Sequence, residues 1–185
     1  FGGDAESSQS MDGWDLLQNG TVLLQVLRNY DNTNHSTTCP KATTIDRNNQ
    51  TLQVTEKLDF KNLTSGTWSS FNSTFQFYNE SGKGYIFMNT TSESGGPPAA
   101  YRFLYTNSNC TVMQLVFVNY NNHTLPSPSD PNNTLCGIWV KPPYTTSRWS
   151  ACNETFYAQC NSTGVYSVYN ETMCNSEDSV TKECS

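Results

Sequence analysis

Two charged residues interrupt strand-like alternations of apolar side chains, and either could bind a ligand or a partner charge. One alternating face contains an acid and consists of Leu52, Val54, Glu56, Leu58 and Phe60. The other contains a base and consists of Val22, Leu24, Val26, Arg28 and Tyr30. A lone buried charge is costly unless it is paired. Three interpretations follow: Glu56 and Arg28 pair with each other, one of them meets a ligand, or the strand end lies in water.

The cysteines and histidines indicate disulfides and neither a metal site nor a catalytic site. The seven cysteines are Cys39, Cys110, Cys136, Cys152, Cys160, Cys174 and Cys184. No two form a C-x-x-C pair, so a zinc site is not expected. His35 and His123 lie in Asn-rich turns without a nucleophile motif, and no phosphate-binding glycine pattern occurs. We therefore expect a disulfide framework with one cysteine left over, no cofactor and no enzymatic activity.

Composition limits the partners further. The chain has 185 residues and a formal net charge of −6, so nucleic acid is not an expected partner. No apolar run approaches the roughly 20 residues that span a bilayer, so no membrane association is expected. Residues 1–10 resemble a flexible leader, and 11–185 are expected to form a single domain. Phe1 begins no signal-peptide pattern, and we expect a mature secreted chain after cleavage.

Thirteen N-x-[ST] sequons support secretion, because such motifs are acceptors of N-linked glycans. We expect glycans at Asn19, Asn34, Asn49, Asn62, Asn72, Asn79, Asn122, Asn132, Asn153, Asn161 and Asn170. The other two sequons begin at Asn89 and Asn109. Asn109 shares a strand face with Thr111 and Met113, so either it lies at a rim or its sequon carries no glycan.

Period-two alternation between Asn, Gly, Pro and Ser turns predicts eight strands. We place them near 21–30, 37–46, 50–60, 68–78, 83–90, 99–106, 110–119 and 135–141. A short helix over 11–18 precedes them and a second helix over 147–160 follows. Eight successive strands with mostly short links predict an all-β fold with a C-terminal helix, in which the strands form an antiparallel up-and-down barrel.

The same alternation predicts which side chains point into the barrel. An outward Asn72 sends Phe71, Phe75 and Phe77 inward. The other predicted inward residues are Tyr101, Phe103, Tyr105, Thr111, Met113, Phe117, Gly137 and Trp139. A barrel of eight strands is filled by its side chains or holds one small ligand. These residues are therefore either core or the lining of a pocket that also contains Arg28 and Glu56.

Several short segments resemble the lipocalins of hard-tick saliva, the group that contains the histamine-binding proteins. They are, in chain order, "DGWDLLQ" (12–18), "RNYDN" (28–32), Cys39, "NC" (109–110), "LCGIWV" (135–140), Cys152 and "VYNETMC" (168–174). Their order and spacing along the chain carry the resemblance. The resemblance implies a lipocalin barrel, a binding function without catalysis, and the bridges Cys39–Cys174 and Cys110–Cys152. Cys136 faces outward in the expected register, which suits a third bridge to Cys184 and leaves Cys160 unpaired.

The resemblance also implies a difference in ligand. Members that capture histamine or serotonin are similar to one another in a Cys-Asp pair, followed later by Glu-Leu-Trp or Glu-Leu-Tyr and then a cysteine. Here Thr111 stands at the Asp position and Gly137 at the Glu position, while Trp139 is kept. Carboxylates pair with the ammonium of such a ligand, so capture in the usual manner is not expected unless Glu56 substitutes.

Two functions remain as expectations. In the first, a secreted monomer suppresses host defence by binding a host immune protein, complement first, through the long loop at 120–134, chiefly the Asn121 to Asn133 region. In the second, the barrel traps a small host ligand such as a lipid mediator, a fatty acid or a sterol, with Arg28 meeting a carboxylate. The sequence favours the first of these two hypotheses.

Overall fold

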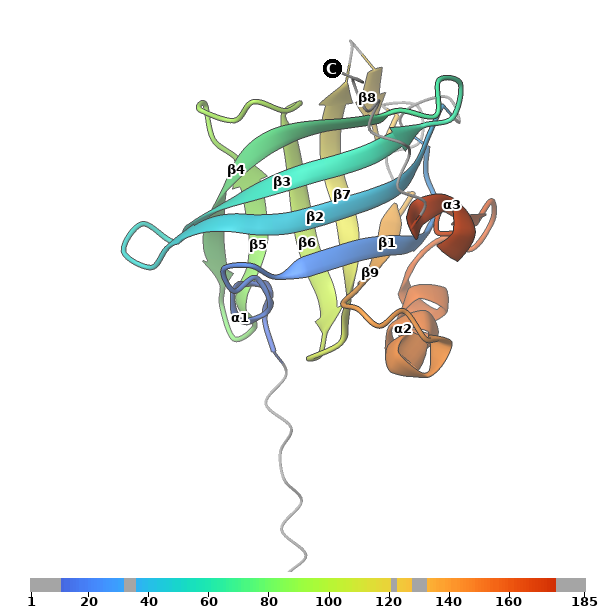
Figure 1. Ribbon diagram of the computed structural model, residues 1–185. Coiled ribbons are helices and arrows are strands. Elements are labelled where there is room, and N and C mark those ends of the chain that lie inside the picture. The colour runs from blue at the N-terminus through green and yellow to red at the C-terminus, as the bar shows by residue number, and fades with distance from the viewer. Residues whose placement is uncertain (1–10, 32–35, 121–122, 128–132, 176–185) are drawn as a thin grey trace, which may run out of the picture.

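The computed structural model describes residues 11–31, 36–120, 123–127 and 133–175. It contains a closed antiparallel barrel whose strands are adjacent in chain order from β1 to β7. Their bounds are β1 Val22–Arg28, β2 Thr37–Asn48, β3 Gln53–Asn62, β4 Trp68–Glu80, β5 Gly84–Thr90, β6 Ala99–Thr106 and β7 Cys110–Tyr120. The eighth strand, β9 (Cys136–Val140), pairs with both β7 and β1 and closes the barrel (Figure 1).

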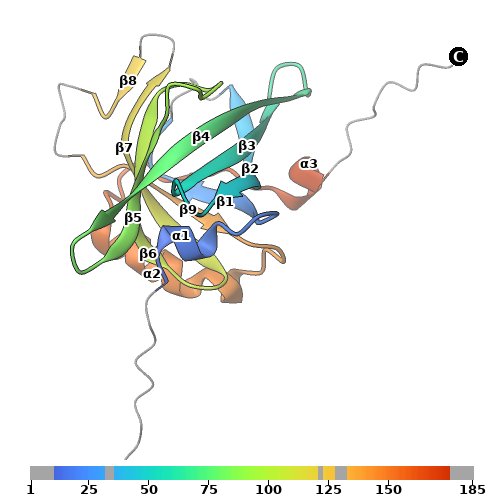
Figure 2. The ribbon, with the colours of Figure 1, turned by 90° about the vertical axis from the view of Figure 1, so that its left-hand side faces the viewer.

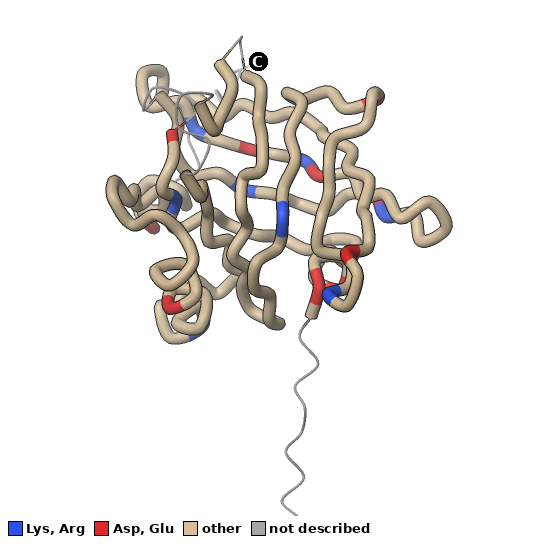
Figure 3. The backbone as a smooth tube through the Cα atoms, turned by 180° about the vertical axis from the view of Figure 1, so that it is seen from behind, with Lys and Arg blue, Asp and Glu red and all other residues tan. Residues whose placement is uncertain are grey.

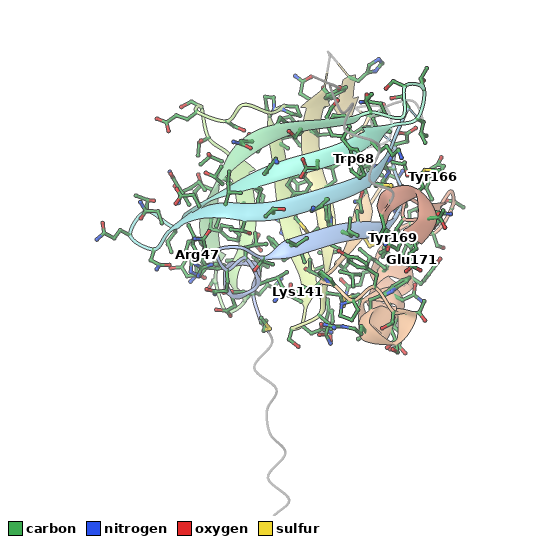
Figure 4. The ribbon with its side chains drawn as sticks, viewed as in Figure 1. Arg47, Trp68, Lys141, Tyr166, Tyr169 and Glu171 are labelled. Atoms are coloured by element: carbon green, nitrogen blue, oxygen red, sulfur yellow. A yellow bond between two sulfur atoms is a disulfide. The ribbon has the colours of Figure 1, made fainter. Side chains whose placement is uncertain are left out.

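The predicted eight-stranded barrel is therefore confirmed, and three further elements extend it. A short strand, β8 (His123–Leu125), forms a hairpin with β7, and β10 (Tyr166–Ser167) pairs with β1. The third is α3 (Glu171–Asn175), which follows β10. Figure 4 labels Tyr166, Tyr169 and Glu171 on this C-terminal segment, beside the end of β1. The predicted leader at 1–10 lies outside the described residues.

One end of the barrel is closed by α1 (Gly13–Leu16), which lies across it in Figure 2. Asp12 starts the helix in a capping box: its side chain accepts from the Asp15 amide at 2.8 Å, and the Asp15 carboxylate accepts from the Asp12 amide at 3.4 Å. Arg47, labelled beside α1 in Figure 4, donates to the Leu17 carbonyl at 2.9 Å and lies 3.7 Å from the Trp14 ring centroid. These contacts fix α1 as a plug.

The second predicted helix is observed as a 3-10 turn, Thr146–Trp149, followed by α2, Ser150–Gln159. It packs outside the barrel against the outward side chains of β7 and β9. Two disulfides, Cys110–Cys152 and Cys136–Cys160, tie α2 to those strands, and Cys39–Cys174 ties β2 to α3. Each bridge of this kind contributes about 2–4 kcal/mol, chiefly by restricting the unfolded chain.

The third bridge corrects the sequence prediction, which joined Cys136 to Cys184. Cys136 does point outward as expected, but α2 brings Cys160 to a Cα–Cα distance of 6.1 Å from it. Cys152 and Phe156 share one buried side of α2, and Cys160, four residues further on, is the buried residue that caps the helix. That spacing is the signal that the prediction overlooked. Cys184 becomes the odd cysteine and lies outside the described residues.

Charged residues are scattered along the described part of the chain and form no single large patch in the view of Figure 3. The ion pairs found there are local, such as Arg102 with Glu80 at 2.8 Å on the outside of the barrel. In the described ranges no helix has the length and apolar character needed to cross a bilayer.

Candidate ligand-binding site

A cavity of about 150 Å³ lies inside the barrel. Its walls are mostly apolar and include Leu23, Leu58, Phe75, Met88, Met113 and Trp139. It reaches from Leu17 beside α1 towards Thr37, Phe60 and Tyr120, at the opposite ends of their strands. The plug at α1 therefore blocks one end, and a ligand would enter from the other.

The structure brings part of the predicted pocket together. Cavity walls are formed by the predicted residues Arg28, Glu56, Phe71, Phe75, Tyr101, Met113 and Trp139. Two others, Phe77 and Phe103, point inward but do not line the cavity, because they fill the closed end. Their rings stack with centroids 5.9 Å apart, and Trp14 meets Phe77 edge-on at 5.3 Å. For these two residues the core interpretation of the sequence is the right one.

Tyr105 and Phe117 are corrections, because both point out of the barrel. The β6–β7 register shifts between Phe103 and Tyr105, so Tyr105 packs outside in the cluster under α2. A second shift leaves one extra residue of β7 between Leu115 and Phe117, and Phe117 is 36% exposed. Each extra residue is a β-bulge that reverses the facing of the side chains beyond it. Alternation counted along a regular strand cannot detect such a bulge.

Thr111 and Gly137, the positions that the resemblance assigns to missing carboxylates, do not line the cavity either. Thr111 is 0% exposed, and its hydroxyl is 2.9 Å from the Tyr105 carbonyl and 2.8 Å from the Thr106 hydroxyl. A Cβ at position 137 would collide with the side-chain amide of Gln25. The space beside Gly137 is therefore filled by Gln25.

Gln25 is the main site residue that sequence reasoning missed. It is 1% exposed, lines the cavity, and donates from Nε2 to the Tyr30 hydroxyl at 3.2 Å. A bulge at Val26 places Gln25 and Arg28 on the inner face of β1, opposite Trp139 and Gly137 of β9. Val26 packs outside under α2. The sequence prediction placed Leu24, Val26 and Arg28 on the inner face of β1. It was therefore wrong for the residues up to the bulge and right for Arg28, which follows it.

Arg28 is 6% exposed and makes no ion pair with Glu56 in the described part of the chain. Its Nη2 lies 3.8 Å from Asp31, its Nη1 donates to Gln25 Oε1 at 3.5 Å, and its Nε has no hydrogen-bond partner. The interpretations in which Arg28 pairs with Glu56, or lies in water at a strand end, are thus wrong. Contact with a ligand stays a prediction.

Glu56 is 3% exposed and also lines the cavity. The Thr44 hydroxyl donates to its Oε1 at 2.6 Å, while its Oε2 has no partner. Burial raises the pKa of Glu56 to about 8, and the bond from Thr44 opposes that shift in part. Glu56 is therefore mainly an uncharged acid at neutral pH, and its burial does not require a cation.

The predicted glycan acceptors differ in exposure. Asn19, Asn49, Asn72, Asn79, Asn161 and Asn170 are exposed, whereas Asn62 and Asn153 are half-buried. Asn34, Asn122 and Asn132 lie outside the described residues. Asn109 is half-buried, and its Oδ1 accepts from Arg148 Nη2 at 2.7 Å, which agrees with the doubt about that sequon. Glycosylation itself stays a prediction.

A closed eight-stranded antiparallel barrel with an outer C-terminal helix and an internal apolar cavity defines a lipocalin. The family described as "Tick histamine binding protein" matches residues 3–176. The chain belongs to this family of tick salivary lipocalins, which bind and do not catalyse. Its three disulfides are consistent with secretion. No curated protein matches the chain.

Solved structures agree with the fold. Japanin from Rhipicephalus appendiculatus, bound to cholesterol, aligns with a TM-score of 0.56 and 15% identity over 85% of this chain and 97% of that chain. The siderocalin Ex-FABP aligns with a TM-score of 0.54 and 8% identity over 80% of this chain and 88% of that chain. At these identities the similarity shows a shared barrel fold.

Proposed function

We propose that this secreted lipocalin sequesters a small, largely apolar host molecule inside its barrel and so withdraws it from host defence. The observation that carries the proposal is the cavity, which is closed at one end by α1 and lined mainly by aliphatic and aromatic side chains. Binding there would remove apolar surface from water, which is the main driving force for ligand capture in such pockets.

The shape of the cavity limits the ligand. Its volume of about 150 Å³ suits a slender molecule or one that extends through the end opposite α1. Japanin, whose solved structure contains cholesterol, supports a lipid of that general kind by analogy of fold. Histamine or serotonin is a weaker candidate, because Thr111 and Gly137 supply no carboxylate and Glu56 is mainly uncharged.

Binding of a host immune protein, complement first, stays a prediction from the sequence. Of the loop assigned to it, residues 121–122 and 128–132 lie outside the described part of the chain. The described part contains β8, which extends the β7 edge of the sheet. No contact or charge of the described residues favours a protein partner over a small ligand, and the ligand trap is accordingly the leading proposal.

Filling the cavity tests the proposal. Ala42 points into the cavity from β2, so Ala42→Phe would place a phenyl ring where the ligand lies. We expect N-phenyl-1-naphthylamine to fluoresce on binding the wild-type protein and to bind the variant at least about tenfold more weakly, a loss of about 1.4 kcal/mol. Its neighbour Thr43 alternates to the outer face, and Thr43→Phe is the matched control with unchanged affinity.

The measurement is a fluorescence titration of all three proteins, with thermal unfolding to show that each is folded. If Ala42→Phe, folded, bound the probe as tightly as wild type, the probe would not occupy the barrel. If the wild-type protein bound no apolar probe or lipid, the proposed function would fail.

A further inference from the structure

We propose that the cavity selects a ligand with a carboxylate head group, which Arg28, Tyr30 and Tyr101 hold, and an apolar body. The proposal rests on the ligand trap described above and specifies the charge of its ligand. These three residues line the same cavity. Tyr30 and Tyr101 also pack against one buried cluster formed by Ala99, Leu115, Val118 and Leu135.

The hydrogen-bonding groups at this corner of the cavity are nearly all donors. Tyr30 accepts from Gln25 Nε2 at 3.2 Å, which leaves its own O–H to donate. Tyr101 has no hydrogen bond within the described residues, and its ring packs edge-on against Phe75 with centroids 5.9 Å apart. Arg28 adds an Nε–H without a partner. A group with several acceptor lone pairs and no donor satisfies such a corner, and a carboxylate is that group.

The Gln25 side chain hydrogen-bonds to both Tyr30 and Arg28, and its amide oxygen is already occupied by the bond from Arg28. Its Oε1 accepts from Arg28 Nη1 at 3.5 Å, and the Arg28 guanidinium lies 5.9 Å from the Tyr30 ring centroid. The space for the Gln25 amide exists because residue 137 has no side chain. The glycine at 137 and the donor-rich corner are therefore two parts of one arrangement.

The charges around the cavity fit an anion. Arg28 is a permanent cation that forms a long ion pair with Asp31 at 3.8 Å, while its Nε–H has no hydrogen-bond partner. Glu56, an acid buried in the cavity wall, is held mainly uncharged by the rise of its pKa to about 8. Asp59 also lines the cavity and faces Lys57 at 3.7 Å. Burial raises the pKa of Tyr30 and of Tyr101, so both phenols keep the protons that they would donate.

The test compares three ligands that share one alkyl chain and differ in the head group: dodecanoic acid, dodecanol and dodecylamine. Each would displace N-phenyl-1-naphthylamine from the wild-type protein near neutral pH. We expect the acid to bind about tenfold or more tightly than the alcohol, and the amine most weakly. Arg28→Gln should weaken the acid by about ten- to a hundredfold and leave the alcohol within about twofold.

Two further variants keep the test decisive. Tyr30→Phe removes only the hydroxyl and should weaken the acid a few-fold, even if Arg28→Gln does not fold. Arg102→Gln neutralises an arginine outside the barrel, paired with Glu80, and should leave every affinity unchanged. Melting temperatures identify any variant that does not fold.

Equal binding of acid and alcohol, unaffected by Arg28→Gln and Tyr30→Phe, would overturn the carboxylate proposal and leave the ligand trap standing. Preference for the amine would overturn it too and would assign the head group to an ionised Glu56. Failure of the probe and of all three ligands to bind would overturn the ligand trap itself.

Discussion

Glu56→Gln is expected to stabilise the folded protein, by an amount that grows as the pH rises. Glu56 is buried in the cavity wall, and its pKa rises from the ordinary value of 4.5 to about 8 on folding. The folded state thus holds this proton more tightly than the unfolded state does. This bound proton stabilises the folded state fully at pH values below the unfolded-state pKa of 4.5. The stabilisation is lost as the pH rises towards the folded-state pKa of about 8.

The size of the effect follows from linkage. A difference of one bound proton changes the free energy of unfolding by about 1.4 kcal/mol per pH unit. Between about pH 5 and about pH 8 the free energy of unfolding of wild type should therefore fall by on the order of 3 kcal/mol relative to that of Glu56→Gln. The amide oxygen of the variant can still accept the bond from the Thr44 hydroxyl. Denaturant unfolding across this pH range measures the difference.

Glu154→Gln, an exposed change on α2, serves as the matched control and should show no comparable gain. Parallel stability curves for Glu56→Gln and wild type across the range would mean that Glu56 ionises freely. An ionised Glu56 in the cavity wall would repel a carboxylate, which would count against an anionic ligand.

Gly137→Ala is expected to destabilise the protein by about 1–3 kcal/mol, which is typical of overpacking a filled site. The new methyl group would meet the Gln25 amide, which the Tyr30 hydroxyl and Arg28 hold in place. In a Gln25→Ala background the same substitution should cost little, because the obstructing side chain is gone. Equilibrium unfolding of the four proteins of this double-mutant cycle measures the coupling.

We expect a coupling energy of about 1–2 kcal/mol between positions 25 and 137. Gly96→Ala in the same two backgrounds is the control, since the obstacles there are the Phe71 ring and the Ser73 hydroxyl and not Gln25. If the effects of Gly137→Ala and Gln25→Ala on the free energy of unfolding were additive, Gln25 would not occupy the space beside Gly137, contrary to the packing described above.

The sequence predicts the order and number of the barrel strands well, because each strand carries a local two-residue alternation that survives folding. The predicted 37–46, 68–78 and 110–119 segments correspond to β2, β4 and β7 with boundary shifts of up to two residues. Facing was predicted correctly along β4 from Phe71 to Phe77, where the strand is regular.

The residues that line the cavity could be predicted from the sequence only in strand segments without a β-bulge. Bulges in β1, β6 and β7 depend on how two strands register with each other, and one strand's sequence does not show that. For this reason Gln25 was missed, and Tyr105 and Phe117 were assigned to the wrong face. Phe77 and Phe103 have the right facing, but only the packing of α1 shows that they belong to a filled end.

Native mass spectrometry of the secreted, enzymatically deglycosylated protein, before and after extraction with organic solvent, tests most directly whether the barrel holds a ligand. If the barrel is a ligand trap, the protein should show a discrete additional mass before extraction. That mass should be lost afterwards and should return when the extracted protein is incubated with a host lipid extract. A mass that equals the chain with its disulfides in all three samples would contradict the claim that this barrel is a ligand trap.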